Sequence, residues 1–289
     1  MSKDKLSAYY RLTKPGVTYG NVLTAVAGFF LASAGSIDIV KGAMMTVGMT
    51  LVIGSACALN NYLDRDIDKI MERTKKRPSV TGEISTMGMR IFPWILLAIG
   101  VGMLAFWTNW LTVAIAIAGF VTYVWLYGAW TKRTSVHGTA VGAVSGALPI
   151  AAGYASVNGV ADIGLAIAFL IIFFWQFPEF YSISIYRRKE YAEAGVPLMS
   201  VVRGVRPTIQ LIAIYTVFYV ASTLALAAWG YAGIVYFVVM ALAGGYWIWL
   251  ATQGLHAKHP ETWSRRMFRF SMYTILLLCL MLSVGPVLP

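Results

Sequence analysis

A cluster of acidic residues directly follows a long apolar stretch, in the segment 59–69 (LNNYLDRDIDK). On a helix, Asn60, Asp64 and Asp68 are four residues apart and share one face, whereas Asp66 points away from it. Two carboxylates and an amide supply the oxygen ligands that Mg²⁺ prefers and leave coordination positions for a phosphate. The alternative is a charged helix end that is solvated by water and headgroups. Ionisable groups at a membrane edge are costly, so a metal–phosphate site is favoured.

We call the shared face of Asn60, Asp64 and Asp68 the acidic stripe. Basic residues follow it within ten residues: Arg73, Lys75, Lys76 and Arg77. Lys and Arg side chains neutralise the charge on a departing diphosphate, and Mg²⁺ often binds between one or two carboxylates and a substrate phosphate. The enrichment of cytoplasmic loops in Lys and Arg also predicts bases at this place. Acids and bases together favour the interpretation that a diphosphate binds here.

A second polar loop, 186–208, carries fewer acids. Within it, Lys189 and Glu190 are candidate catalytic residues, and Glu190 is the best candidate partner for the acidic stripe. Inside the preceding apolar stretch, Gln176 and Glu179 flank a proline, which together predict a kink and a polar pocket in the membrane. For Glu179, a buried, neutral and hydrogen-bonded carboxyl is an equal alternative.

These candidates belong to a strongly apolar chain of 289 residues, 58% hydrophobic and 12% charged. Such a composition excludes a soluble domain and predicts an all-α polytopic membrane protein. Nine stretches approach the ~20 residues needed to cross the hydrocarbon core; they lie at about 17–35, 42–61, 91–107, 110–129, 138–157, 163–185, 209–229, 231–252 and 270–287. Cys57 and Cys279 both lie in such stretches and indicate neither a disulfide nor a metal site.

The distribution of positive charge predicts the orientation. If the N-terminus is cytoplasmic, the inner segments hold 22 of the 23 Lys and Arg residues, and only Lys41 lies outside. The net charge of +11 therefore reflects topology and not a nucleic-acid partner. A signal peptide ending in the Ala-Ser-Ala at 32–34 is the weaker alternative, because its removal would break this alternation. We expect a plasma-membrane protein with its C-terminus outside, one domain over 1–289, and active-site loops at about 62–90 and 186–208.

The acidic segment and the residues after it resemble the signature of the protoheme IX farnesyltransferase (heme O synthase) family, a branch of the UbiA-type intramembrane prenyltransferases. The signature covers Asn60–Asp68 and Met71–Pro78. Supporting motifs spread over nearly the whole chain; they are Leu12–Gly16, Lys132–Ser135, Gly146–Pro149, Lys189–Tyr191 and Ala194–Pro197. The resemblance implies nine transmembrane helices in one bundle around a central cavity that opens laterally toward lipid.

The resemblance also implies a reaction and its partners. The reaction would be the Mg²⁺-dependent transfer of a farnesyl group from farnesyl diphosphate to a vinyl group of heme b, with addition of water, to make heme O. Membrane lipid would surround the bundle, and a heme A synthase or a terminal oxidase assembly would consume the product. No nucleic acid takes part.

Site residues follow from the same resemblance. The metal ligands would be Asn60, Asp64 and Asp68, and the two carboxylates would act in catalysis together with Lys189 and Glu190. Diphosphate contacts would come from Asn60, Lys14, Arg73, Lys76, Arg77 and Lys189, and acceptor contacts from Glu179, Gln176 and His137. The family commonly has histidine at the position of Glu179 and aspartate at that of Glu190. The first difference bears on how the acceptor is held.

In the expected mechanism, an allylic diphosphate ionises while metal and bases stabilise the leaving group. The apolar bundle shields the carbocation from water, and Trp125, Tyr127, Phe174 and Trp175 are candidates to line its path. Two alternatives remain: a prenyltransferase for a quinone precursor or lipid, and a transporter. The transporter is disfavoured because the acids cluster at the membrane edge and the spans carry few charges near their middle.

Overall fold

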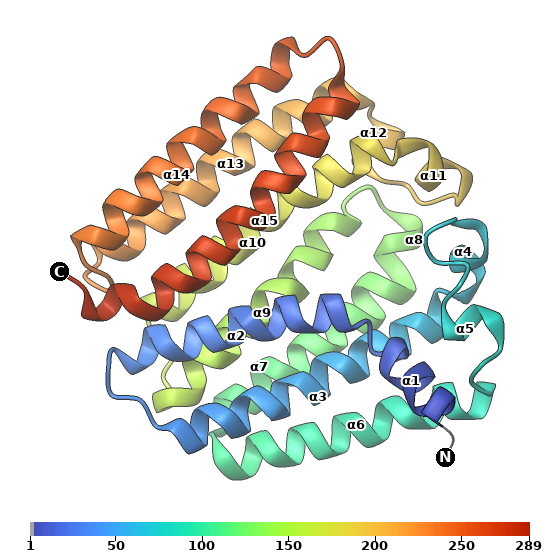
Figure 1. The fold of residues 1–289 in the computed structure, drawn as a ribbon, viewed down its shortest axis with the longest axis horizontal. Coiled ribbons are helices and arrows are strands. Elements are labelled where there is room, and N and C mark those ends of the chain that lie inside the picture. Colours follow the sequence, from blue (N-terminus) through green and yellow to red (C-terminus); the bar gives the residue numbers. More distant parts are fainter. Residues whose placement is uncertain (1–2) are drawn as a thin grey trace.

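The computed structural model describes residues 3–289, which are helical and contain no β-strand (Figure 1). Nine spans in this part of the chain are long and apolar enough to cross a membrane. They are α2 (Pro15–Ser33), α3 (Ile39–Leu63), α6 (Thr86–Trp107), α7 (Trp110–Val121) continued by η1 (Thr122–Thr131) and α8 (Lys132–Thr134), α9 (Gly138–Asn158), α10 (Ile163–Tyr186), α13 (Val205–Ala228), α14 (Ile234–Gln253) continued by η2 (Gly254–His256), and α15 (Pro260–Val284) continued by η3 (Gly285–Val287). The prediction of an all-α membrane protein with nine spans is confirmed.

Short helices gather at one end of the bundle, which we call the polar end (Figure 1). They are α1 (Lys3–Leu12), α4 (Arg65–Ile70), α5 (Pro78–Thr81), α11 (Arg188–Glu193) and α12 (Met199–Val202). The segments predicted as loops therefore contain short helices, and these helices hold the polar side chains in fixed positions.

The last span begins about ten residues earlier than hydropathy predicts. Helix α15 starts at Pro260, where proline is favoured because the first helical N–H needs no partner in the helix. Arg265, Arg266 and Arg269 consequently lie on the first turns of a membrane helix and not in a loop. A count of apolar residues misses such a charged helix start.

Close backbone contact joins α2 to α9 through glycines. A Cβ on Gly153 would lie 1.8 Å from the carbonyl oxygen of Ala25, and one on Gly28 would lie 2.2 Å from that of Ile150. Small residues permit such an approach of membrane helices. Helix α9 thus packs tightly on α2 and contributes buried residues to both large apolar clusters, one with α10, α13, α14 and α15, the other with α3, α7 and η1.

Helices α2 and α15 meet at only one of their ends. Ala27 and Leu31 of α2 belong to the same buried cluster as Leu278 and Leu282 of α15. Toward the polar end the two ribbons diverge (Figure 1). The first turns of α2 and of α15 therefore flank different sides of the polar end.

Candidate active site

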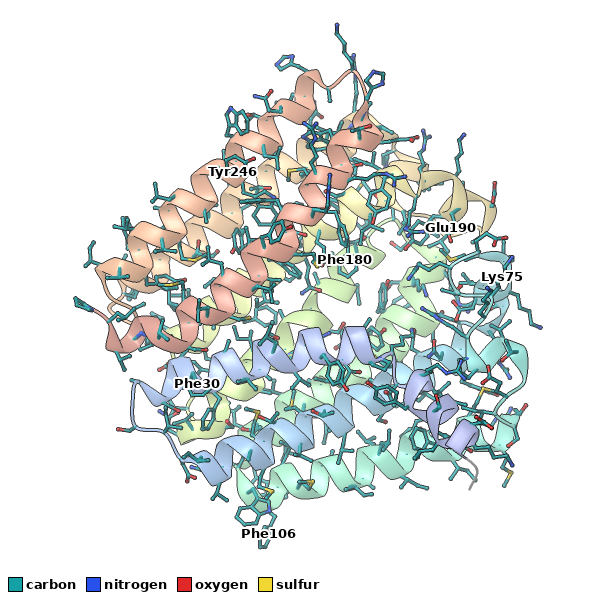
Figure 2. All side chains as sticks on the ribbon, viewed as in Figure 1. Phe30, Lys75, Phe106, Phe180, Glu190 and Tyr246 are labelled. Atoms are coloured by element: carbon teal, nitrogen blue, oxygen red, sulfur yellow. The ribbon has the colours of Figure 1, made fainter. Side chains whose placement is uncertain are left out.

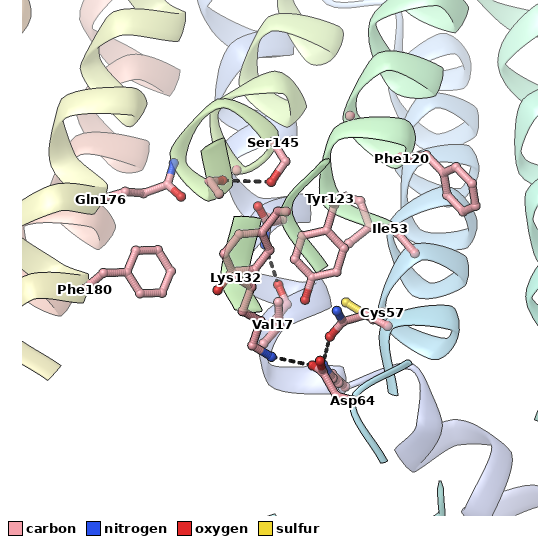
Figure 3. Close-up of a pocket in the computed structure, with 18 of the residues that line it drawn as sticks. Val17, Ile53, Cys57, Asp64, Phe120, Tyr123, Lys132, Ser145, Gln176 and Phe180 are labelled. Atoms are coloured by element: carbon pink, nitrogen blue, oxygen red, sulfur yellow. Dashed lines mark hydrogen bonds and ion pairs between the residues drawn. The ribbon is translucent and has the colours of Figure 1, made fainter. Parts of the chain in front are cut away.

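A cavity of about 280 Å³ lies between α2, α3, η1, α9 and α10 (Figure 3). At the polar end, its wall carries the oxygen-rich and basic side chains of Asn60, Asp64, Asp68, Lys14, Arg73, Arg77 and Lys132. Farther into the bundle the wall is apolar and aromatic, with Met49, Val52, Ile115, Phe120 and Leu148. This one cavity thus combines a site for anions at its polar end with a hydrophobic wall farther in.

Asn60, Asp64 and Asp68 face this cavity together and are each at most 3% exposed. Helix α3 ends at Leu63, but the amides of Asp64 and Asp68 donate to the carbonyl oxygens four residues earlier, at 2.9 and 2.8 Å. The helical spacing is therefore kept across the break. The side chain of Asp66 is 65% exposed and lies elsewhere.

Asp66 binds Arg133, which lies 67 residues later in the chain, through two hydrogen bonds of 2.7 and 2.8 Å. These bonds hold the pKa of Asp66 well below its usual range. The pair fastens α4 to the end of α8. Asp66 thus has a structural partner, whereas the other two aspartates face the cavity.

Each polar side chain of the acidic stripe is bound to a basic side chain. The ammonium of Lys132 lies 2.5 Å from Asp64 Oδ2, and Arg77 donates to both oxygens of Asp68 at 2.9 and 2.8 Å. Lys14 donates to Asn60 Oδ1 at 2.5 Å. Three cations from three segments therefore converge on one corner of the cavity.

Two polar atoms in this corner are buried without a hydrogen-bond partner: Asp64 Oδ1 and Asn60 Nδ2. The nearest cation to Asp64 Oδ1 in the salt-bridge geometry is Arg133, at 3.7 Å. A buried oxygen without a partner costs about 1–3 kcal/mol, so it points to a missing contact. Among the described residues, no three His, Cys, Asp or Glu side chains come together. Two carboxylates with room for phosphate oxygens fit Mg²⁺, which seldom uses an all-protein cage.

Lys14 adopts a rare backbone conformation at the start of α2, with φ 50° and ψ 67°. Residues other than glycine seldom occupy this left-handed region, and such strain concentrates at functional sites. Burial and the neighbouring Arg77 lower the pKa of Lys14 to about 8, although Asp64 opposes the shift. An anionic ligand beside the ammonium would counteract both effects and favour its charged form.

A π-helix aims Lys132 at the acids. In an α-helix, the nine residues from Tyr123 to Lys132 make about 2.5 turns, which would put the two side chains on opposite sides. The segment η1 is π-helical, and its i→i+5 hydrogen bonds turn the chain more slowly. Tyr123, Tyr127 and Lys132 therefore all line the cavity.

Gly128 in η1 leaves room for Asn60. A Cβ at this position would lie 2.7 Å from Asn60 Nδ2 and 3.1 Å from the carbonyl oxygen of Tyr123. We expect Gly128→Ala to lower kcat/KM for a diphosphate donor by at least about tenfold, because small displacements at a reacting centre have large effects on rate. The measurement is KM and kcat for the donor together with the melting temperature.

Gly102→Ala is the matched control, because a Cβ on this helical glycine meets nothing within 4 Å. We expect it to leave activity unchanged. Wild-type kinetics in Gly128→Ala would show that the position of Asn60 does not matter.

Several residues with predicted roles do not line this cavity. Lys76, Lys189 and His137 are exposed at the surface. Glu190 is held by Arg187 at 2.9 Å, and its second oxygen is buried without a partner. Instead of these residues, Tyr191 covers the cavity, because its segment packs on α4 through Ile67, Met71 and Val196.

The two predicted acceptor residues of α10 differ in their position relative to the cavity. Gln176 lines the cavity and donates to the carbonyl oxygens of Ala143 and Ile172, at 3.1 and 3.3 Å. Glu179 is half-buried beside this wall and forms no hydrogen bond or ion pair with the described residues. Of the two interpretations of Glu179, the hydrogen-bonded carboxyl is therefore contradicted, and contact with the acceptor stays a prediction.

Of the four aromatic residues predicted to line the path, only Tyr127 does so. Trp125 is 43% exposed on the outer surface, where an apolar ring meets lipid. Phe174 stacks on Phe218 of α13 with ring centres 5.3 Å apart, and Trp175 donates to the carbonyl oxygen of Ser271 in α15. For these three the prediction was wrong, because helix packing turns them away from the cavity.

A model of the UbiA prenyltransferase family matches residues 21–275. The chain belongs to the UbiA prenyltransferase family. It is 42% identical to a protoheme IX farnesyltransferase of Chromohalobacter salexigens, over 96% of this chain and 95% of that protein. It is 40% identical to protoheme IX farnesyltransferase 2 of Pseudomonas aeruginosa, over 97% of this chain and 95% of that one.

Solved structures share the UbiA fold. A digeranylgeranylglyceryl phosphate synthase has a TM-score of 0.83 with 18% identity, covering 98% of this chain and 99% of its own. A UbiA homologue from Archaeoglobus fulgidus, bound to DMAPP and Mg²⁺, has a TM-score of 0.72 with 17% identity and covers 95% of this chain and 98% of its own. These neighbours establish the helical arrangement of the family for this chain.

The sequence analysis missed Lys132, Tyr123 and Tyr191 as residues of the UbiA cavity. Lys132 and Tyr191 stood in short motifs that carried no assigned role. The available signal was an isolated lysine after a span with a tyrosine five residues earlier. This signal indicates a shared face for the lysine and the tyrosine only when the span is known to end in a π-helix.

Proposed function

We propose that this chain transfers a farnesyl group from farnesyl diphosphate to a vinyl group of heme b, with addition of water, to form heme O. The observation that carries the proposal is the cavity, with converging acids and bases at one end and an apolar wall beyond. The activity for which the 40–42% identical relatives are named supplies the identity of the substrates.

At the polar end, Asn60, Asp64 and Asp68 would hold Mg²⁺. When bound there, Mg²⁺ would supply positive charge that stabilises the leaving group. The bases Lys14, Arg77 and Lys132 would then exchange their contacts with the acidic stripe for contacts with diphosphate oxygens. Such donors, fixed before the reaction, favour departure of the diphosphate.

Along the wall, aromatic faces replace water around the allylic cation. Phe120, Tyr123 and Tyr127 line the cavity, and the negative face of an aromatic ring attracts a cation. The apolar residues beyond them exclude water, so that the acceptor's vinyl carbon and not solvent reaches the cation first. The chain's residues thus separate carbon–carbon bond formation from hydrolysis.

Across the cavity from Asp64, Gln176 and Phe180 form the wall on α10 (Figure 3). This is where the acceptor would lie. We expect Glu179→Leu to raise KM for heme b by about tenfold while farnesyl diphosphate binding stays unchanged, because an ionisable group kept inside a membrane span has a functional use. Equilibrium binding of each substrate and the melting temperature are the measurements.

Glu179→His is the informative companion variant and should preserve farnesylation. If Glu179→Leu instead lowers the melting temperature strongly and weakens donor binding, Glu179 has a structural role and leaves the acceptor site.

We further propose that the polar end faces the cytoplasm, with the chain in the plasma membrane and its C-terminus outside. In a background without Cys57 and Cys279, both of which are buried, we expect new cysteines at exposed Thr81 and Ala192 to react only from the inner side. A cysteine at exposed Ser36 should react only from the outside. The opposite labelling pattern would reverse the orientation.

The deciding experiment is mass spectrometry of hemes after incubation of the purified protein with Mg²⁺, farnesyl diphosphate and heme b. The expected product is heme b plus a farnesyl group and a hydroxyl group, because the water that adds to the vinyl group loses one proton. A downstream heme A synthase or terminal oxidase would then use this product. Consumption of the donor only with a quinone precursor or lipid acceptor would overturn the heme assignment. The Asp64→Ala protein is the negative control.

A further inference from the structure

Three arginines crowd the first turns of α15. Arg265, Arg266 and Arg269 are all exposed, and none forms an ion pair or a hydrogen bond with the described residues. Glu261, four residues before Arg265, does not pair with it either. Like charges four residues apart destabilise a helix by a few tenths of a kcal/mol. Nothing within the described fold compensates these charges.

One of these arginines lies against the end of α10. The guanidinium carbon of Arg265 is 5.2 Å from the ring centre of Tyr186, and that of Arg187 is 5.6 Å from the same ring. Phe268 is a further neighbour, with its ring centre 6.0 Å from that of Tyr186. Arg187 is neutralised by Glu190. Of the two arginines beside the Tyr186 ring, only Arg265 therefore lacks an ion-pair partner among the described residues.

This aromatic and basic cluster adjoins the cavity. Ile183 and Phe180, which line the cavity, precede Tyr186 by one and two helical turns. Tyr186 is thus about 9 Å from Phe180 along α10, on the scale of a porphyrin ring. Phe180 is 41% exposed and lies in the angle between α15 and α2 in the view of Figure 2. The cavity therefore reaches the molecular surface at Phe180, on the same helix as the Tyr186 ring that Arg265 contacts.

We propose that Arg265 and Arg269 bind the two propionate carboxylates of the porphyrin acceptor, with the rings of Tyr186 and Phe268 against the macrocycle. Arginine is suited to bidentate contact with carboxylates, and two guanidiniums one turn apart match two carboxylates on one edge. In heme b the vinyl groups lie away from the propionate edge. Holding that edge at the surface directs a vinyl group toward Asp64 and Lys132. This inference rests on the proposed function.

The test compares heme b with its dimethyl ester, in which both propionates are neutral. In the wild type, we expect the ester to have a KM at least about tenfold higher, which corresponds to one lost charge-assisted contact of roughly 1.4 kcal/mol. In the Arg265→Gln/Arg269→Gln double variant, KM for heme b should rise to the value for the ester, and the ester itself should be unaffected. KM for farnesyl diphosphate should not change.

Arg266→Gln is the control for position, because it removes one positive charge from the same turns at a residue about 100° around the helix from Arg265. It should discriminate heme b from the ester as the wild type does. The same discrimination in the double variant would overturn the proposal. Equal weakening of both hemes in the double variant would also overturn it, because that result indicates a structural role.

Anionic phospholipid headgroups offer the same chemistry as propionates. Nanodiscs with and without phosphatidylglycerol separate the two sources. If activity depends on this lipid in the wild type but not in the double variant, and heme b and its ester behave alike, the arginines bind lipid and the proposal is overturned.

Spectroscopic titration of metal-free protein with heme b and with its ester measures the difference in binding between the two without turnover. Arg-dependent discrimination there, without farnesylated product, would support this site and overturn the proposed reaction.

Discussion

Asp64→Ala and Asp68→Ala should each reduce farnesyl transfer by at least about 10³-fold, because loss of a single preorganised charge contact at a reacting centre lowers the rate by about 10²–10³-fold, and in the proposed site these residues would also hold the metal. Both carboxylates are buried at the same corner of the cavity. The measurement is the rate of diphosphate release at saturating Mg²⁺, with melting temperature to establish folding.

Asp66→Asn is the internal control for this experiment, because Asp66 lies two residues from both but is exposed and bound to Arg133. We expect its turnover to stay within about fivefold of the wild type, since Asp66 does not line the cavity and an asparagine there can still accept a hydrogen bond from Arg133. Retained activity in Asp64→Ala or Asp68→Ala would remove that residue from the site. A loss in Asp66→Asn equal to that in Asp64→Ala would show that the stripe faces another way.

Lys132→Met should lower kcat by about 10²–10³-fold, because the leaving diphosphate loses a fixed cation. The variant should also be less stable, since removing one partner of a buried pair leaves Asp64 uncompensated at a cost of about 3–5 kcal/mol. The two effects can be separated. Asp64→Asn/Lys132→Met removes both charges and should regain stability without regaining activity.

Arg133→Gln is the neighbouring control for Lys132. It breaks the pair with Asp66, the bond to the carbonyl oxygen of Leu63 and the longer 3.7 Å ion pair with Asp64. It should therefore lower the melting temperature, while activity per folded molecule should fall less than in Lys132→Met, because Lys132 lies 2.5 Å from Asp64. If Lys132→Met retains turnover, the ammonium only balances Asp64 and plays no part in releasing the diphosphate.

The sequence alone was sufficient for the helical class, the nine spans and the acidic stripe. Spans follow from the cost of placing polar groups in hydrocarbon, which adds up along the chain. The stripe follows from helical periodicity, which is local and survives the break after Leu63. For the same reason the separation of Asp66 from Asp64 and Asp68 was predictable.

Only the tertiary structure decided which basic residues face the acids. Asn60 and Lys14 are 46 residues apart, and Asp64 and Lys132 are 68 residues apart. Such pairs depend on how the helices pack, and no local pattern encodes that. Lys76 was near in sequence but points to the surface, whereas Lys132 reaches the cavity because a π-helix changes the rotation of the chain before it.

The arginines of α15 show the same difference between what the sequence determines and what the tertiary structure determines. The sequence placed Arg265 and Arg269 in a basic inner segment, as the charge distribution of a membrane protein requires. The structure places them on the first turns of α15, with Arg265 over the ring of Tyr186 near the cavity. Charge and hydrophobicity are properties of a segment and can be summed from its residues. The contact of one guanidinium with one ring depends on the crossing of two helices, which packing alone determines.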